Sequence, residues 1–308
     1  MASATSEPAL RRRRGSSPPS AGSSNTVMNT AKSIEKRLNP PSSGRGTSSQ
    51  TGVATTPSSR QATAQQSVNI WSHLLGSLVF SGLGFITYWL YESAIKPRYT
   101  SATGADVLAF GCFFVGAFVC LGMSATYHAL TNHSPEVARW GNKLDYSGIV
   151  FLIVGSYMPA LYYGFNCLPG LMRIYLSMVN LASGGGCLVV SWFEHFRTSQ
   201  WRPYRAMMFV SLGLSGVVPV LHGLTIYGYQ SLNERMGLNW VILQGVLYIL
   251  GAAIYAARWP ERSRSSKFDI WGSSHQIFHI LILFAAASHL YGMAKAFDYH
   301  HGSLGAKC

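Results

Sequence analysis

The chain has 308 residues, of which 48% are hydrophobic and only 11% are charged, whereas charged residues make up about 25% of a typical soluble domain. The formal net charge is +13, but the basic residues gather in the amino-terminal tail and beside long apolar runs, a placement that suits anionic lipid headgroups better than a nucleic acid. This composition excludes an ordinary soluble domain and predicts a multi-pass integral membrane protein, of the plasma membrane or an endomembrane, that binds no nucleic acid.

Residues 1 to 66 form the first segment. They consist largely of Ser, Thr, Pro, Gly and Ala, have no aromatic side chains and include the run Arg11 to Arg14. Such a segment buries too little apolar surface to offset the entropy lost on ordering. We therefore predict a disordered basic tail over residues 1–66 and a transmembrane domain over residues 67–308.

Seven apolar runs follow the tail, and each is long enough to cross about 30 Å of hydrocarbon at about 1.5 Å of rise per residue. They are Ile70–Tyr91, Val107–Leu130, Ser147–Phe165, Leu171–Phe193, Tyr204–Tyr227, Leu238–Ala257 and Ile277–Phe297. The predicted fold class is all-α, an integral membrane bundle of seven transmembrane helices. Cys112, Cys120 and Cys187 fall inside these runs and no CxxC pair is present, so we expect packed thiols rather than a disulfide framework.

The lysines and arginines indicate how the bundle is oriented. Nine lie in the tail, nine in the loops that follow the second, fourth and sixth runs, and six on the opposite side. Because the cytosolic side of a membrane protein carries the excess of Lys and Arg, we expect a cytosolic amino terminus and an extracytosolic carboxyl terminus.

Three histidines and one carboxylate fall near the cytosolic ends of their predicted helices. His128 lies at the end of the second run, Asp145 just before the third, and His275 and His279 at the start of the seventh. His275 and His279 are four residues apart, so on a helix both project from one face and can hold one ion. His128 would complete a three-nitrogen Zn²⁺ site with an open fourth position. Asp145 could polarise a water there or act as a general base, and Ser124, one turn from His128, could hydrogen-bond the same water or a reacting carbonyl.

Simpler interpretations stay open at this point. An HxxxH pair at a helix end is common without a metal, and Asp145, two residues after Lys143, could form an interfacial ion pair or cap a helix. His73, at the start of the first run, either supports the site or packs through a hydrogen bond. Ionisable groups inside a membrane are costly and by default mark a functional site, so the co-location of three histidines with Asp145 favours the metal.

Four stretches carry a resemblance to a known family. They are VNIWSHL at residues 68–74, SATYH at 124–128, KLDYSGI at 143–149 and HQIFH at 275–279. In these stretches the chain resembles the progestin and adipoQ receptor family, which includes adiponectin receptors, fungal zinc-homeostasis membrane proteins and, more distantly, haemolysin III. It looks like a member of the fungal zinc-homeostasis type, and the resemblance covers roughly residue 66 to the end. One departure is visible, because the family often has Glu three residues before Asn69, where this chain has Gln66.

The resemblance implies Zn²⁺ on His128, His275 and His279, with Asp145 engaging a water at the metal and Ser124 in the same site. It also implies hydrolysis of lipid amides, notably ceramide, and receptor signalling in lipid metabolism and metal homeostasis. The partners it implies are ceramide or a related membrane lipid, an extracellular protein ligand and cytosolic signalling proteins.

Three functions compete on these grounds. The first is a zinc-dependent lipid amide hydrolase, similar to a ceramidase, with Asp145 as the base. The second is a receptor whose zinc site is purely structural and which hydrolyses nothing. The third, a transporter or channel, is disfavoured because charged pairs deep in several helices are missing.

Overall fold

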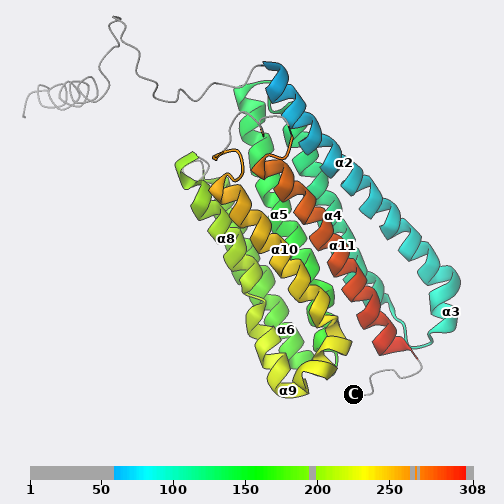
Figure 1. Ribbon diagram of the computed structural model, residues 1–308. Coiled ribbons are helices and arrows are strands. Elements are labelled where there is room, and N and C mark those ends of the chain that lie inside the picture. The colour runs from blue at the N-terminus through cyan, green and yellow to red at the C-terminus, as the bar shows by residue number, and fades with distance from the viewer. Residues whose placement is uncertain (1–58, 194–198, 264–267, 269–270, 303–308) are drawn as a thin grey trace, which may run out of the picture. The chain divides into compact units, whose positions relative to one another are not determined.

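The computed structural model describes residues 59–193, 199–263, 268 and 271–302. Over these residues the chain forms helices and turns, with no β-strand, and the long helices run alongside one another as a bundle (Figure 1). The predicted fold class, an all-α integral membrane bundle, is confirmed. The predicted orientation of the two termini stays a prediction.

The helices follow one another through short connections. In chain order they are α2 (Ser59–Leu90), the π-helix η1 (Tyr91–Ile95), α3 (Lys96–Arg98), α4 (Gly104–Leu130), α5 (Pro135–Gly164), α6 (Pro169–Ser177), the π-helix η2 (Met178–Gly184), α7 (Gly185–Trp192), the short 3₁₀ helix η4 (Ser199–Trp201), α8 (Arg202–Leu214), α9 (Val217–Met236), α10 (Leu238–Ala257) and α11 (Ser274–His301).

Six helical segments in the described part of the chain are long and apolar enough to cross a membrane. They are Gln66–Arg98, Gly104–Leu130, Pro135–Gly164, Pro203–Met236, Leu238–Ala257 and Ser274–His301. The fourth predicted run, Leu171–Phe193, corresponds to α6, η2 and α7, which follow one another without a loop. The π-helix η2 separates the two α-helical parts, α6 and α7. Glycine is a weak helix former, and three successive glycines at residues 184–186 lie where η2 gives way to α7.

The first helix begins earlier than the apolar runs indicated. α2 starts at Ser59, so the expected boundary at residue 66 falls inside a helix. The rest of the predicted tail, residues 1–58 with Arg11 to Arg14, lies outside the described residues. The polar residues that open α2 therefore belong to the same helix as the first apolar run.

The third helix also begins well before its apolar run. α5 starts at Pro135 rather than near Ser147. Ser134 caps the helix by accepting a hydrogen bond from the amide of Val137 at 3.2 Å, and proline is favoured at the first helical position. Asp145 consequently lies in the interior of α5 and does not cap it.

Glycines allow α4 and α5 to approach closely. A Cβ atom added at Gly148 would lie 2.8 Å from Cα of Cys120, and one at Gly155 would lie 2.5 Å from the carbonyl oxygen of Cys112. Neither distance is tolerated between real atoms, so a larger residue fits only if a helix moves. Small residues of this kind let membrane helices pack backbone against backbone.

The fifth predicted run is interrupted between α8 and α9, at Ser215 and Gly216. The hydroxyl of Tyr157, on α5, accepts a hydrogen bond from the Gly216 amide at 3.0 Å and donates to the carbonyl oxygens of Gly213 and Leu212, the latter at 3.1 Å. Ser215 and Gly216 keep right-handed helical backbone angles, but a backbone group that leaves the helical hydrogen-bond pattern at membrane depth must be satisfied by the protein. Tyr157 performs that task at this break.

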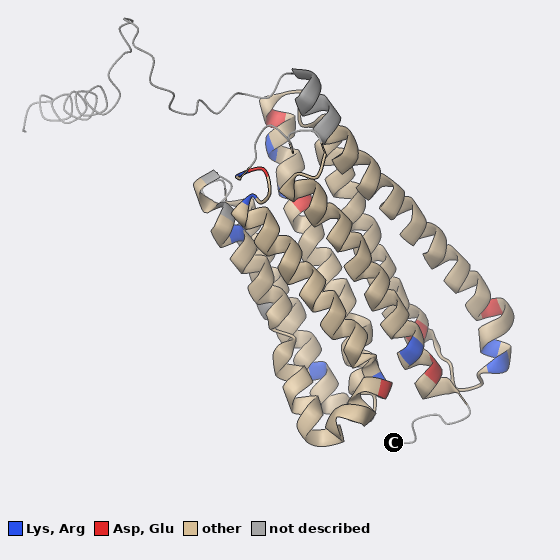
Figure 2. Cartoon of the chain, in the orientation of Figure 1, with Lys and Arg blue, Asp and Glu red and all other residues tan. Residues whose placement is uncertain are grey.

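The outside of the bundle is apolar. Phe85 is 77% exposed and Val115 is 61% exposed, and the charged residues gather toward the two ends of the helices (Figure 2). This distribution, together with the six apolar spans, confirms an integral multi-pass membrane protein.

The cysteines only partly follow the prediction. Cys112, Cys120 and Cys187 are free thiols, as expected for cysteines inside apolar helices. Cys167, in the connection after α5, is disulfide-bonded. The three cysteines expected as packed thiols are therefore confirmed as free, whereas the disulfide at Cys167 was not predicted.

Candidate metal centre

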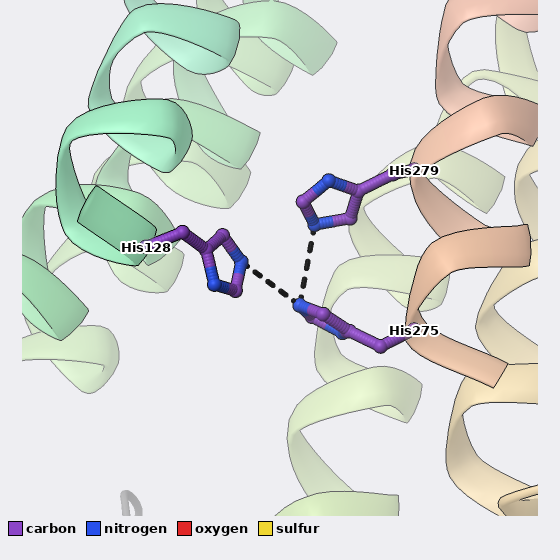
Figure 3. Close-up of side chains that lie close together, drawn as sticks. All are labelled: His128, His275 and His279. Carbon is purple, nitrogen blue, oxygen red and sulfur yellow. Dashed lines mark hydrogen bonds between the residues drawn. The ribbon is translucent and has the colours of Figure 1, made fainter. Parts of the chain in front are cut away.

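Three imidazoles converge from two helices. His128 lies in the last turn of α4, and His275 and His279 lie in the first two turns of α11. Nε2 of His275 is 3.0 Å from Nε2 of His128 and 3.2 Å from Nε2 of His279 (Figure 3). One ring nitrogen from each of the three histidines lies within 4.8 Å of the other two. His128 and His279 are buried and His275 is half-buried.

The spacing of these nitrogens fits a tetrahedral metal. Zn–N bonds of about 2.0–2.1 Å at tetrahedral angles place two ligating nitrogens about 3.3 Å apart, close to the observed 3.0 and 3.2 Å. A neutral imidazole carries one N–H and one lone pair, so a single proton on Nε2 of His275 cannot bond to both neighbours at once. A cation at the point where the three nitrogens meet would satisfy all three lone pairs.

Asp145 and Ser124 form a pair beside the histidines. Asp145 accepts a hydrogen bond from the hydroxyl of Ser124, across the close contact between α5 and α4. Asp145 is not a member of the three-residue ligand group, but it lines the same cavity as His275 and His279. The ion-pair alternative does not describe the structure, because the amine of Lys143 lies over the rings of Trp140 and Trp192, at 4.9 and 5.6 Å from their centroids.

Two residues of α2, Gln66 and His73, contact the histidines. The sequence alone places Gln66 in the tail and leaves the role of His73 open. Oε1 of Gln66 lies 2.6 Å from Nδ1 of His128, although residue 66 was expected to end the tail. The ring of His73 stacks on that of His279, with centroids 3.6 Å apart and an angle of 9° between the planes. Gln66 lies seven residues before His73, and residues seven apart share one helical face. Gln66 could therefore have been found by extending the first predicted helix by one turn toward the amino terminus.

A cavity of about 410 Å³ opens beside the histidines and is lined mostly by apolar side chains. Asp145, Ser124, His275 and His279 line it, and so does His289, which is 2% exposed. His289 follows His279 by ten residues, which corresponds to about 15 Å along a helix axis. The cavity is therefore long enough, and apolar enough, to hold an extended hydrocarbon chain whose polar end lies at the histidines.

Comparison with known proteins relates the chain to a family of membrane proteins. Residues 62–290 match the family model described as haemolysin-III related. The chain is 46% identical over 231 residues to the adiponectin receptor protein of Drosophila melanogaster, a match that covers 75% of this chain and 50% of the relative. It is 41% identical over 236 residues to ADIPOR-like receptor IZH2 of Saccharomyces cerevisiae, covering 77% of this chain and 73% of the relative.

A plant relative bears on the number of helices. The chain is 41% identical over 180 residues to heptahelical transmembrane protein 5 of Arabidopsis thaliana, covering 58% of this chain and 48% of the relative. That name agrees with the seven predicted runs, the fourth of which is divided among α6, η2 and α7. The chain spans about half the length of the fly and plant relatives.

Proposed function

The chain belongs to the haemolysin-III related family, and we propose that it is a zinc-dependent receptor of the adiponectin-receptor type that also hydrolyses a ceramide-like lipid amide inside the membrane. Adiponectin-receptor-like membrane proteins are among its relatives. The observation that carries the proposal is the convergence of three histidine nitrogens beside an apolar cavity that also holds Asp145.

Each residue of the centre has a role in this proposal. His128, His275 and His279 would hold Zn²⁺ through their Nε2 atoms. The bound ion would supply Lewis acidity, which lowers the pKa of water toward about 7 and polarises an amide carbonyl. Asp145 would take a proton from the attacking water and deliver it to the leaving nitrogen as the C–N bond breaks, so that the products are a fatty acid and an amine. Ser124 would hold the Asp145 carboxylate in place through their hydrogen bond.

The cavity supports a lipid as the substrate. Its lining is mostly apolar, and its polar side chains include Ser124, Asp145, His275 and His279. Apolar binding sites of this kind orient a ligand through placed polar groups. An acyl chain in the cavity would bring its carbonyl to the centre without leaving the membrane. The extracellular protein ligand and the cytosolic partners belong to the receptor half of the proposal, which rests on the names of the relatives.

The alternative is a receptor whose zinc is structural. It shares the three histidine ligands but gives Asp145 no part in chemistry. The experiment that separates the two uses purified full-length protein, with zinc measured by elemental analysis and fatty acid released from ceramide measured by mass spectrometry. The variants are His128→Ala, Asp145→Asn and, as a matched control, His133→Ala, which changes an exposed histidine outside the site.

We expect about one zinc per chain in the wild type and in His133→Ala, and none in His128→Ala. Asp145→Asn should keep its zinc and lose about 100-fold or more of its turnover, the usual contribution of a general base. Full turnover in Asp145→Asn would show that Asp145 is not the base. Zinc without release of fatty acid from any lipid amide would favour the structural alternative, and wild-type protein without stoichiometric zinc would refute the proposal.

A further inference from the structure

We propose that Gln66 is a positioning residue of the metal centre, whose side-chain oxygen accepts the Nδ1 proton of His128 and thereby commits Nε2 of that ring to the metal. The inference rests on the proposed function, because it assumes that the three histidines hold Zn²⁺. It adds a residue from a helix that contributes no ligand and that lies 62 positions away from His128 in the chain.

The hydrogen bond determines which nitrogen of His128 carries the proton. Oε1 of Gln66 is an acceptor and lies 2.6 Å from Nδ1, so Nδ1 is the protonated nitrogen of the neutral ring. Its other nitrogen, Nε2, then presents a lone pair, and this is the atom that faces His275 at 3.0 Å. Metal-ligating histidines commonly donate their second N–H to a carboxylate, a carbonyl or water, which fixes both tautomer and ring orientation.

The same face of α2 restrains a second ligand. His73 is 3% exposed, and its ring lies flat against that of His279, with 3.6 Å between centroids. Stacking at this distance fixes the plane of the His279 imidazole and so the direction of its Nε2. Gln66 and His73 are seven residues apart, two helical turns, so one face of α2 orients two of the three imidazoles.

An amide in this place differs chemically from a carboxylate. A carboxylate partner would make the imidazole more basic and strengthen its bond to the metal, whereas a neutral amide oxygen orients the ring with a weaker electronic effect. Gln66→Glu keeps a side-chain oxygen of similar length that can accept the Nδ1 proton of His128. Gln66→Ala removes that acceptor, so the hydrogen bond to Nδ1 is lost. The pair of variants therefore separates the orienting hydrogen bond from the mere presence of a side chain at residue 66.

The test measures zinc affinity of the full-length protein in detergent, by competition with a chelator of known affinity. The variants are Gln66→Ala, Gln66→Glu and Gln230→Ala, the last of which truncates an exposed glutamine on α9. We expect Gln66→Ala to bind zinc 10–100-fold more weakly than the wild type. Gln66→Glu should bind at least as tightly as the wild type, and Gln230→Ala should bind like the wild type.

Two results would overturn the inference. One is a Gln66→Ala protein that unfolds cooperatively and binds zinc as tightly as the wild type. The other is a Gln66→Glu protein that loses as much affinity as Gln66→Ala, because an acceptor would then fail to restore the site. Wild-type protein that binds no zinc is a different outcome and refutes the proposed function, whereas zinc in the wild type with no change in Gln66→Ala refutes only the role of Gln66.

Discussion

Gly148 sets the distance between α4 and α5, and replacing it tests whether that distance matters for the site. A Cβ at residue 148 would lie 2.8 Å from Cα of Cys120. An ordinary carbon–carbon contact begins near 3.4 Å, so Gly148→Ala requires the two backbones to separate locally by about 0.6 Å. Extra atoms forced into a well-packed interior cost about 1–3 kcal/mol, and we expect the free energy of unfolding to fall by that amount.

The displacement also reaches the candidate site. Asp145 lies one turn before Gly148 on α5, and its hydrogen-bond partner Ser124 lies on α4, so separating the helices stretches that bond. Misplacement of reacting groups by about 1 Å can cost about 100-fold in rate. For a shift of about 0.6 Å we expect turnover of the lipid amide to fall by roughly 10-fold or more. Zinc content should stay near one per chain, because the change does not touch a histidine.

The assays are thermal unfolding in detergent, zinc content and fatty acid release, each compared with Gly111→Ala. Gly111 lies on α4, the partner helix, and a Cβ there meets nothing within 4 Å. Alanine is the better helix former by about 1 kcal/mol, so Gly111→Ala should be neutral or slightly stabilising. If Gly148→Ala matches Gly111→Ala in stability and turnover, the close approach of the two helices does not position Asp145, and the reasoning is wrong.

Three further changes have defined outcomes. Tyr157→Phe removes the hydroxyl that accepts from the Gly216 amide and donates to the carbonyl oxygens at the break, and it should lower the free energy of unfolding by about 1 kcal/mol. The control is Tyr88→Phe, at an exposed tyrosine of α2, and equal unfolding midpoints would contradict the role of Tyr157. Val241→Trp adds a large ring to the cavity lining, so it should abolish lipid turnover while the zinc content stays that of the wild type. Val115→Trp, on the exposed surface, should change neither the lipid turnover nor the zinc content. Chelation of the metal should lower the unfolding midpoint of the wild type, because a ligand at 100 times its Kd stabilises the folded protein by about 2.7 kcal/mol. If chelation lowers the midpoint of His279→Ala by the same amount, the stabilising ion does not bind at the three histidines.

The sequence predicted the meeting of the three histidines because helix direction and length determine it. His128 ends one long apolar run and His275 begins another, so antiparallel packing brings them to the same level. The close pair of Asp145 and Ser124 was expected at a similar depth, and the structure adds that they share a hydrogen bond. What these residues do chemically stays a proposal.

Apolar runs could not predict where helices begin. α2 opens with polar residues, and the start of α5 is set by the Ser134 cap and Pro135 rather than by hydropathy. Gln66 was assigned to the tail for this reason, although its side chain reaches His128. The division of the fourth run into α6, η2 and α7 escaped prediction in the same way, because its average hydropathy conceals three successive glycines.

The early start of α2 decides how the chain can be shortened for biochemical work. A fragment cut at the compositional boundary, starting at residue 67, would retain His128, His275 and His279 but lose Gln66. Its first helix would open only six residues before His73, where terminal turns fray. A fragment that begins before Ser59 keeps both residues within an intact helix. On the proposed role of Gln66, a truncation chosen by hydropathy alone would yield a bundle that inserts into the membrane but binds zinc weakly, and it would be mistaken for an inactive protein.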